Sequence, residues 1–285
     1  MRSTITILKP GLFTSIQDLG RFGYSEYGVP VSGAMDQYAM QLSNTLLDNL
    51  KNDAVLEWTL LPPVLQFNDT AKISLTGASL FPMLNNKVIK YSAVMEVQKG
   101  DVLSFKPCRN LVYGYVGILN GFQSPDVLNS KSFYNGITEI PSCQKNTILP
   151  FKTLKDLTST ATRVIPQLDE EQDGVIHVFP GPEFDQLSKS QQQKLMTSKF
   201  TIGQTRSRMG IQLQEKLDND LSGIITSPVL PGTVQLTPDG TLVVLMRDAQ
   251  TTGGYPRVLQ LSEKAINTIA QTPSGTQLEF ELQQF

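Results

Sequence analysis

The residues best suited to chemistry follow a strongly apolar segment in the C-terminal part of the chain. Leu242 to Met246 is a continuous apolar run of strand length, and a polar stretch follows it directly. Binding and catalytic groups concentrate on loops that a rigid sheet supports. The groups in this loop that we expect to contact a ligand are Asp248, Gln250, Thr251, Thr252, Gly253, Gly254 and Tyr255. The alternative is a polar hairpin whose side chains only satisfy its own backbone.

A second polar loop follows the expected strand Phe13 to Gln17. The candidate residues of this loop and of the turn after it are Gln17, Asp18, Arg21, Ser32, Gly33 and Asp36. Arg21 could bind a carboxylate or phosphate with its planar guanidinium, oriented by the carboxylate of Asp18. The alternative is a local ion pair between these two residues that only holds the loop.

Arg208 lies in a third polar segment and supplies a second guanidinium. We predict that this arginine and the two loops converge on one cleft, with Asp18, Arg208 and Asp248 as the catalytic residues. Either carboxylate would orient an arginine or act as a base. Gly253 and Gly254 would let backbone N–H groups approach an oxyanion closely. The rival interpretation is that these motifs lock barrel loops and a subunit contact.

Several common site types are absent from the sequence. There is no P-loop, no dinucleotide-binding glycine spacing and no GxSxG elbow. The single histidine, His177, makes a histidine-based zinc site improbable, and Cys108 and Cys143 lack metal-binding spacing. We therefore expect no metal site and no biotin attachment site in this chain. Carboxylates, arginines, hydroxyls and backbone amides remain, and these suit chemistry at an acyl or amide centre.

Composition narrows the class of protein further. The 285 residues are 40% hydrophobic and 18% charged, with a net charge of −2. These values are typical of a globular protein and argue against a nucleic-acid partner. No apolar run is long enough to span a bilayer, and the first residues lack the pattern of a signal peptide. We expect a cytoplasmic protein with free, buried thiols.

Strand patterns dominate the elements that must position these residues. The chain is expected to be mainly β with a few short helices, in a β-rich unit with one amphipathic helix at 1–160 and a second β unit at 175–285. The two units should meet near residues 155–175. An apolar stripe predicts the helix between Met35 and Leu50. Proline and glycine after Lys9 predict a hairpin between the first two strands.

Three further expectations concern single elements. Glu57 lies in the middle of an apolar strand, so it must face solvent or meet a partner such as an arginine. Val234 and Leu236 alternate with polar residues, which predicts a half-buried strand. Short helices are expected from Glu183 to about Met196 and from Glu263 to Ala270, the second with Ser262 as its cap.

Four segments in this order resemble one protein family. They are TSIQDLGR at 14–21, GVPVSGAMD at 28–36, RMG at 208–210, and the stretch from GTVQ at 232–235 to Tyr255–Pro256. Together they resemble the biotin-dependent carboxyltransferase, KipA-like family, also called allophanate hydrolase subunit 2. The resemblance spans nearly the whole chain. Among family members it is nearest to the small free-standing type that serves as the C subunit of bacterial 5-oxoprolinase.

The resemblance implies cyclophilin-like β-barrel units, including one in the C-terminal unit. It implies a subunit of an ATP-dependent 5-oxoprolinase, which opens 5-oxo-L-proline to L-glutamate and is active only as a complex. The implied partners are a KipI-like subunit and a third, amidohydrolase subunit, with ATP used by the complex. Two alternatives stay open: the carboxyltransferase component of a urea carboxylase or allophanate system, and a non-catalytic regulatory binding protein.

One segment departs from the family pattern. Where relatives carry Ser-Arg-Ser-Thr, this chain has Ser130, Lys131, Ser132 and Phe133. Lysine cannot bind a carboxylate through two parallel hydrogen bonds as arginine does. The departure bears on the identity of the substrate and on activity itself.

Overall fold

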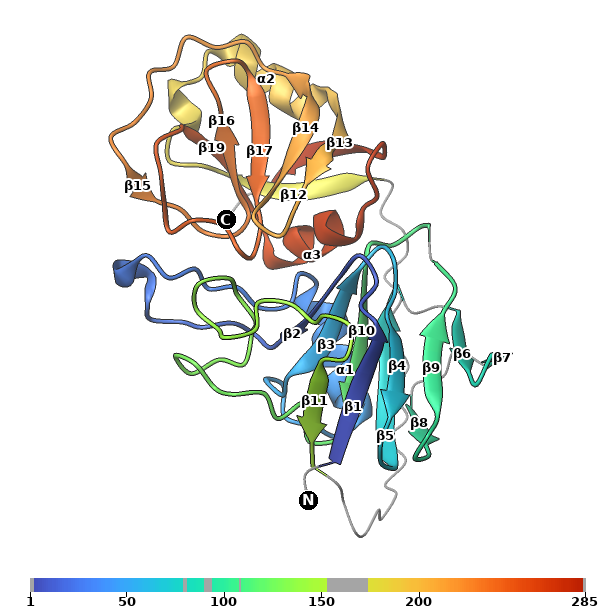
Figure 1. The fold of residues 1–285 in the computed structure, drawn as a ribbon. Coiled ribbons are helices and arrows are strands. Elements are labelled where there is room, and N and C mark those ends of the chain that lie inside the picture. The colour runs from blue at the N-terminus through green and yellow to red at the C-terminus, as the bar shows by residue number, and fades with distance from the viewer. Residues whose placement is uncertain (1–2, 79–80, 90–93, 108, 153–173, 284–285) are drawn as a thin grey trace. The chain divides into compact units, whose positions relative to one another are not determined.

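The computed structural model describes residues 3–78, 81–89, 94–107, 109–152 and 174–283, in two compact units (Figure 1). The first unit comprises Met1–Arg21 and Ser32–Pro166, and the second comprises Phe22–Val31 and Gln167–Phe285. The expected boundary near residues 155–175 falls almost entirely outside the described residues. The mainly β fold expected from the sequence is confirmed.

Two antiparallel sheets enclose the core of the N-terminal unit. Trp58 lies in this core, where its ring centroid is 4.6 Å from that of Phe105. One sheet has the order β11-β1-β4-β9-β6-β7, and the other β2-β3-β10-β5-β8. Their bounds are β1 Ser3–Lys9, β2 Phe13–Gln17, β3 Val55–Thr59, β4 Val64–Phe67, β5 Ala71–Gly77, β6 Pro82–Leu84, β7 Lys87–Val88, β8 Val94–Val97, β9 Val102–Phe105, β10 Tyr113–Ile118 and β11 Ile148–Phe151.

The expected hairpin between β1 and β2 is wrong, because the two strands belong to different sheets. β1 pairs with β4 and β11, whereas β2 pairs with β3. Gly11 (φ +70°) carries the chain from one sheet to the other, and a Cβ there would lie 2.1 Å from the carbonyl oxygen of Leu61. Both strands find long-range partners, which local turn signals could not reveal.

Helix α1, Gln37–Leu46, packs on β5 and β10 and is shorter than the expected stripe. Tyr38 is 53% exposed, and Leu50 lies outside the helix and is exposed. The buried face instead includes Ser43, whose Oγ lies 2.7 Å from Ser74 Oγ. Met35, Ala39 and Leu46 of the stripe are buried as expected, and the small polar side chains bring the helix close to the sheet.

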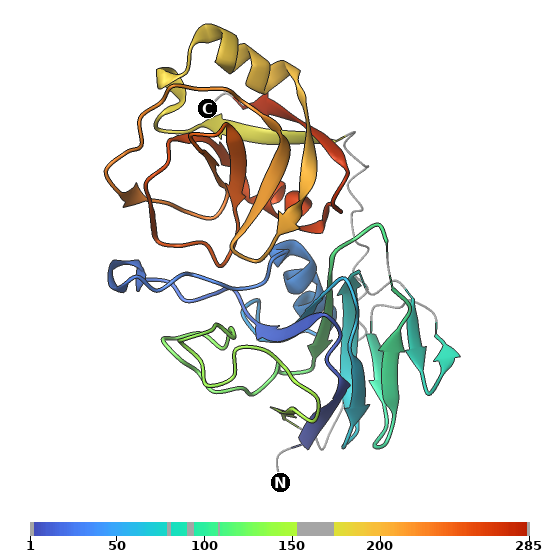
Figure 2. The same ribbon diagram turned by 45° about the horizontal axis from the view of Figure 1, so that its top comes forward.

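The C-terminal unit is a closed barrel with the strand order β12-β19-β16-β17-β14-β13-β20 (Figure 2). β12 and β20 close the barrel as a parallel pair, and the other neighbouring strands are antiparallel. Val234 and Val244 are register partners on its inner face, and Phe200 packs on Phe280 with ring centroids 5.4 Å apart. The bounds are β12 Val175–Pro180, β13 Lys199–Arg206, β14 Gly210–Lys216, β16 Thr233–Leu236, β17 Thr241–Leu245, β19 Arg257–Leu261 and β20 Gln277–Leu282.

β15, Ser227–Pro228, and β18, Thr252–Gly253, form a separate two-stranded ribbon in the same unit as the barrel. Val229 and Ala249, on the chain beside this ribbon, pack with Leu245 and Val243 of β17. The expectation that β16 is half-buried is therefore wrong, since all four of its residues are buried. Its outer face is covered by segments that the strand's own periodicity does not describe.

Short helices complete the second unit. The predicted helix from Glu183 to about Met196 is divided into a 3-10 turn, η2 Phe184–Gln186, and α2, Lys189–Thr197. Ser188 forms a capping box with Gln191, which sets the start of α2. Helix α3, Glu263–Gln271, begins at the predicted cap, where Ser262 Oγ accepts from the Ala265 N–H. A further 3-10 turn, η1, spans Ser25–Tyr27.

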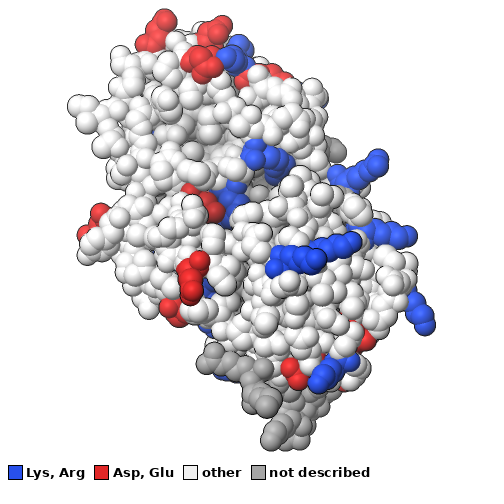
Figure 3. Space-filling model, viewed as in Figure 1, with Lys and Arg blue, Asp and Glu red and all other residues white. Residues whose placement is uncertain are grey.

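The remaining sequence expectations concern thiols, membrane spans and charge. Cys143 is a free, buried cysteine, and Cys108 lies outside the described residues. Within the described residues, none of the helices has the length and apolar character to cross a membrane. On the face shown in Figure 3, uncharged residues make up most of the surface, and charged side chains of both signs are present.

Candidate functional site

Asp18 lies directly after β2 and is only 2% exposed. Its carboxylate accepts four hydrogen bonds. Its Oδ1 accepts from Gly20 N at 2.8 Å and from Ser130 Oγ and Ser132 Oγ at 2.7 Å each. Its Oδ2 accepts from Lys131 N at 2.6 Å. Three of these donors meet at Oδ1 and one reaches Oδ2, so the carboxylate holds Gly20 and the segment 130–132 in place. The geometry suits a positioning role better than that of a base.

The neighbours of Asp18 hold the same distant segment. The Arg21 guanidinium is buried and donates from Nη2 to the carbonyl oxygen of Ser132. Gln17 Nε2 donates to the carbonyl oxygen of Phe133 at 3.3 Å. The segment 130–133 is the stretch that departs from the family pattern. Sequence reasoning missed Ser130 and Ser132 as partners, and the two serines on either side of Lys131 were the available signal.

The turn from Ser32 to Asp36 packs back onto the same loop. Ser32 (φ 59°) and Gly33 (φ 93°) both adopt left-handed backbone angles. A Cβ on Gly33 would lie 2.8 Å from the carbonyl group of Leu19, so only glycine fits that contact. Asp36 caps α1 by accepting from the Ala39 N–H at 3.0 Å. The cap fixes both where the helix starts and where the turn ends.

A buried acid and a buried phenol hold this turn from the sheet below. Glu57 of β3 and Tyr115 of β10 are register partners, and Tyr115 Oη donates to Glu57 Oε2 at 2.8 Å. The backbone N–H groups of Met35 and Asp36 donate to Glu57 Oε2 and Tyr115 Oη, at 2.8 and 2.9 Å. Glu57 was expected to face solvent or to meet a partner such as an arginine. It is buried and meets a tyrosine and a backbone amide.

The electrostatics of this pair follow from burial. The pKa of Tyr115 lies well above its ordinary value, first because burial disfavours the phenolate and then because the Glu57 and Asp36 carboxylates repel it. Tyr115 therefore keeps its proton and remains a donor to Glu57. The sequence did not point to this tyrosine, because no local pattern shows which residue of the neighbouring strand lies opposite Glu57.

Arg208 and Asp248 form a paired group in the C-terminal unit. Nε donates to Oδ2 at 2.8 Å and Nη2 donates to Oδ1 at 2.9 Å, with both side chains nearly buried. The Asp248 N–H also donates to the carbonyl oxygen of Arg208 at 2.9 Å. This parallel arrangement is the strongest geometry for an arginine and a carboxylate. Asp248 is placed to orient Arg208, the first of the two roles expected for it.

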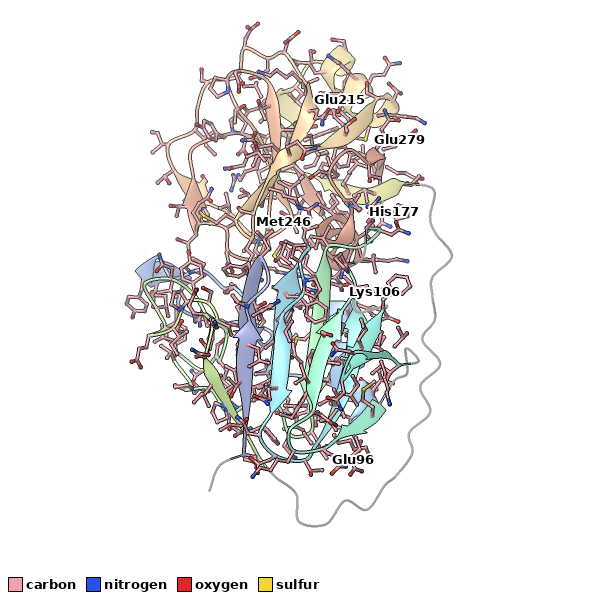
Figure 4. All side chains as sticks on the ribbon, turned by 45° about the vertical axis from the view of Figure 1, so that its right-hand side comes forward. Glu96, Lys106, His177, Glu215, Met246 and Glu279 are labelled. Carbon is pink, nitrogen blue, oxygen red and sulfur yellow. The ribbon has the colours of Figure 1, made fainter. Side chains whose placement is uncertain are left out.

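The polar loop after β17 supplies one strand of the β15–β18 ribbon. Met246, labelled in Figure 4, is the last apolar residue before this loop. Thr252 and Gly253 make up β18, and the Thr251 and Gly254 carbonyl oxygens accept from Val229 N and Ile224 N at 3.1 and 3.0 Å. Gln250 Nε2 lies 3.5 Å from Gln235 Oε1, and Tyr255 is exposed. The ribbon places these residues over the outer face of β16.

An ion pair anchors this ribbon to the barrel. Glu183 accepts from Arg257 at Nε and Nη2, at 2.9 and 2.7 Å, and Arg257 Nη1 donates to the Pro228 carbonyl oxygen at 2.9 Å. The hydrogen bonds from Arg257 lower the pKa of Glu183 despite its burial. Arg257, paired with Glu183, therefore ties β15 to β19.

The predicted residues thus form two groups, each within its own unit. The first unit holds Gln17, Asp18, Arg21, Ser32, Gly33 and Asp36, and the second holds Arg208, Asp248, Gln250, Thr251, Thr252, Gly253, Gly254 and Tyr255. Convergence of the two groups on one cleft stays a prediction, as do the catalytic roles. Among the described residues, no cluster of three or more His, Cys, Asp or Glu side chains could hold a metal ion.

Comparison with known proteins places this chain in a family. The family model described as "Carboxyltransferase domain, subdomain A and B" matches residues 27–282. The chain belongs to this carboxyltransferase-domain family. The carboxyltransferase-domain chain is 29% identical to the C subunit of 5-oxoprolinase from Escherichia coli and 30% identical to that from Haemophilus influenzae. Each match covers 97% of this chain and 90% of the relative.

Larger proteins contain a region similar to this chain. The chain is 26% identical to urea amidolyase of Saccharomyces cerevisiae, over 98% of its length but only 16% of that protein. The solved structure of TTHA0988 superposes with a TM-score of 0.87 at 22% identity, covering 98% of this chain and 56% of that one. Kluyveromyces lactis urea amidolyase superposes with a TM-score of 0.85 at 25% identity, covering 98% and 19%. The chain thus spans little more than half of the first of these structures.

Proposed function

We propose that this chain is a subunit of an ATP-dependent 5-oxoprolinase that opens 5-oxo-L-proline to L-glutamate. The observation that carries the proposal is length-matched similarity: the 5-oxoprolinase relatives match this chain over nine-tenths of their own length. The urea amidolyase relative matches over less than a fifth of its own. We further propose that the chain acts only with partners, a KipI-like subunit and an amidohydrolase subunit, in the cytoplasm.

The chemistry of a lactam explains why ATP is needed. A lactam carbonyl is a weak electrophile, so transfer of the γ-phosphoryl group of ATP to its oxygen would activate the ring carbon and release ADP. Water would then attack that carbon, and the C–N bond would break with a proton delivered to nitrogen, which leaves a γ-glutamyl phosphate. A second water would hydrolyse this acyl phosphate to L-glutamate and phosphate. We assign ATP to the complex and leave open which subunit binds it.

The residues of this chain would stabilise the charge that develops on oxygen. Arg208, held in one orientation by Asp248, and Arg21 would bind phosphate or carboxylate groups. Asp18 would position the segment 130–132 rather than transfer a proton. The backbone of Gly253 and Gly254 would contribute N–H groups near the oxyanion.

A second candidate function is carboxyl transfer to a urea-like amide. The family description and the similarity to urea amidolyase along almost the whole chain favour it. A third hypothesis is that the chain is a non-catalytic regulator that binds a protein partner. Of the three, the length match favours the 5-oxoprolinase subunit.

Reconstitution separates these functions. The full chain would be co-purified with its subunit partners and supplied with ATP and either 5-oxoproline, or urea, bicarbonate and a biotin carrier. ATP-dependent glutamate release supports the proposal, and urea-dependent carboxylation supports the second candidate. Co-purification without turnover of either substrate would favour the regulator and contradict the proposal.

A further inference from the structure

Gln235 is a buried amide on the outer face of the barrel. It lies on β16, opposite Val243 of β17 and Arg257 of β19, and register partners point to the same side of a sheet. Outward positions of a barrel normally meet solvent, yet Gln235 is 3% exposed. The segments around the β15–β18 ribbon cover it.

The hydrogen bonds of this amide are incomplete. Its Oε1 lies 3.5 Å from Gln250 Nε2, at the outer limit of a hydrogen bond. Its Nε2 is buried and has no hydrogen-bond partner within the described parts of the chain. A buried donor without a partner costs about 1–3 kcal/mol, so this group needs an explanation.

Gly253 makes room for that amide. A Cβ on Gly253 would lie 2.3 Å from Gln235 Nε2. The backbone angle gives no reason for a glycine, since Gly253 does not have a left-handed φ. Position 253 is therefore constrained by the amide of Gln235, and a larger residue there would push the amide aside.

The cover over Gln235 is held by the hydrogen bond from Arg257 to the Pro228 carbonyl oxygen and by a short strand pairing. β15 and β18 pair through two residue positions only, Ser227 with Gly253 and Pro228 with Thr252. Local openings cost least where few buried contacts and backbone hydrogen bonds hold a segment. A small displacement of this ribbon would bring a ligand to the Gln235 amide.

We propose that the carboxamides of Gln235 and Gln250 bind the amide group of the substrate beneath the β15–β18 ribbon. Gln235 Nε2 donates to the substrate carbonyl oxygen, which gives the unpaired donor its partner. The ligand class is a small lactam or urea-type amide. The inference rests on the proposed function and deepens it, because it names the group that this chain recognises.

The test is ligand-observed NMR titration of the full chain, alone and with its partner subunits. The probes are 5-oxo-L-proline, urea and L-proline, which keeps the ring and carboxylate of 5-oxoproline but lacks the lactam carbonyl. We expect binding of at least one amide probe and no binding of L-proline. Gln235→Met, which keeps the length of the side chain, and Gly253→Ala should each weaken that binding about tenfold.

The control variant is Gly223→Ala, in the same covering segment. A Cβ there would meet the Gly254 carbonyl oxygen at 3.4 Å, and it should bind the probes as the wild type does. Gln235→Met should also keep or raise the Tm, because it removes the unpaired donor. A purely structural Gln235 would instead give a lower Tm and unchanged binding, which overturns the proposal.

Failure of the inference and failure of the proposed function have different signatures. Wild-type turnover of 5-oxoproline with an unchanged KM in Gln235→Met overturns the amide site and leaves the function standing. Urea binding that depends on Gln235, without 5-oxoproline turnover, overturns the function and supports the site. Binding of neither amide probe, or equal binding of L-proline, overturns the amide site.

Discussion

Arg208 and Asp248 meet through two parallel hydrogen bonds, of 2.8 and 2.9 Å, although 40 positions separate them in the sequence. Arg208 precedes β14 and Asp248 follows β17, and these strands are neighbours in the barrel. The barrel therefore brings together an arginine and a carboxylate that neither loop could hold alone. Because both side chains are nearly buried, the pair has consequences for stability as well as for the proposed chemistry.

The first prediction separates those two consequences. Arg208→Ala leaves the Asp248 carboxylate buried without its partner and should destabilise the protein by about 3–5 kcal/mol. Arg208→Lys keeps the charge but loses the planar fork, so it should fold nearly normally and lose turnover in the reconstituted complex. Denaturant unfolding and glutamate release measure the two effects. Full activity in a folded Arg208→Lys complex would contradict the role of Arg208.

A double variant is the matched control for this pair. Arg208→Met with Asp248→Leu replaces both charges with apolar groups, which is often neutral for stability. We expect a folded, partner-binding and inactive protein. If activity instead follows the amount of folded complex in every variant, the pair is structural only.

A second prediction concerns the Asp18 carboxylate. Asp18→Asn replaces one acceptor oxygen with an NH₂ group. The Gly20 N–H still points at the Oδ1 position and the Lys131 N–H at the Oδ2 position. One donor then faces another, and the loss should be about 1–3 kcal/mol. Ser132→Ala removes a single donor and should cost less. Chemical denaturation of the two variants gives the order, and equal losses would contradict the account.

Tyr115→Phe tests how the Ser32–Asp36 turn is held. The substitution removes the acceptor of the Asp36 N–H and the donor to Glu57, both in a buried place. We expect a loss of about 1–3 kcal/mol, with faster amide hydrogen exchange at Met35 and Asp36. Tyr38→Phe is the matched control, because that tyrosine is exposed. Unchanged exchange in Tyr115→Phe would rule out the clamp.

The Glu183–Arg257 pair should make stability depend on pH. Its hydrogen bonds lower the pKa of Glu183 from an ordinary value of 4.5. The carboxylate therefore contributes stability above about pH 4.5, and the contribution is lost as the pH falls through the lowered folded-state pKa. Glu183→Gln should be less stable than the wild type at pH 7, with the difference shrinking toward pH 3. A difference independent of pH would refute the charged pair.

Cys143 should be unreactive while the protein is folded. Burial raises the pKa of its thiol to about 12, so almost none of the nucleophilic thiolate is present at pH 8. In a Cys108→Ser background, iodoacetamide should modify Cys143 only at the rate at which the protein opens. Low concentrations of urea should then accelerate labelling, whereas rapid labelling without urea would show that the thiol is accessible.

Local sequence determined the elements of this protein whose causes are local. The Ser262 cap predicted the start of α3, because capping involves residues only a few positions apart. The family resemblance identified from the motifs is confirmed by the family model. The polar loops were identified as candidate sites on the same local grounds.

Tertiary structure alone decided the partners of the candidate residues. Asp18 meets Ser132 across 114 positions, and Glu57 meets Tyr115 across 58, because strand pairing brings distant segments together. The burial of Gln235 depends on a ribbon that β16 itself does not encode. A buried polar group must find a partner, and which partner it finds depends on how the chain is folded around it.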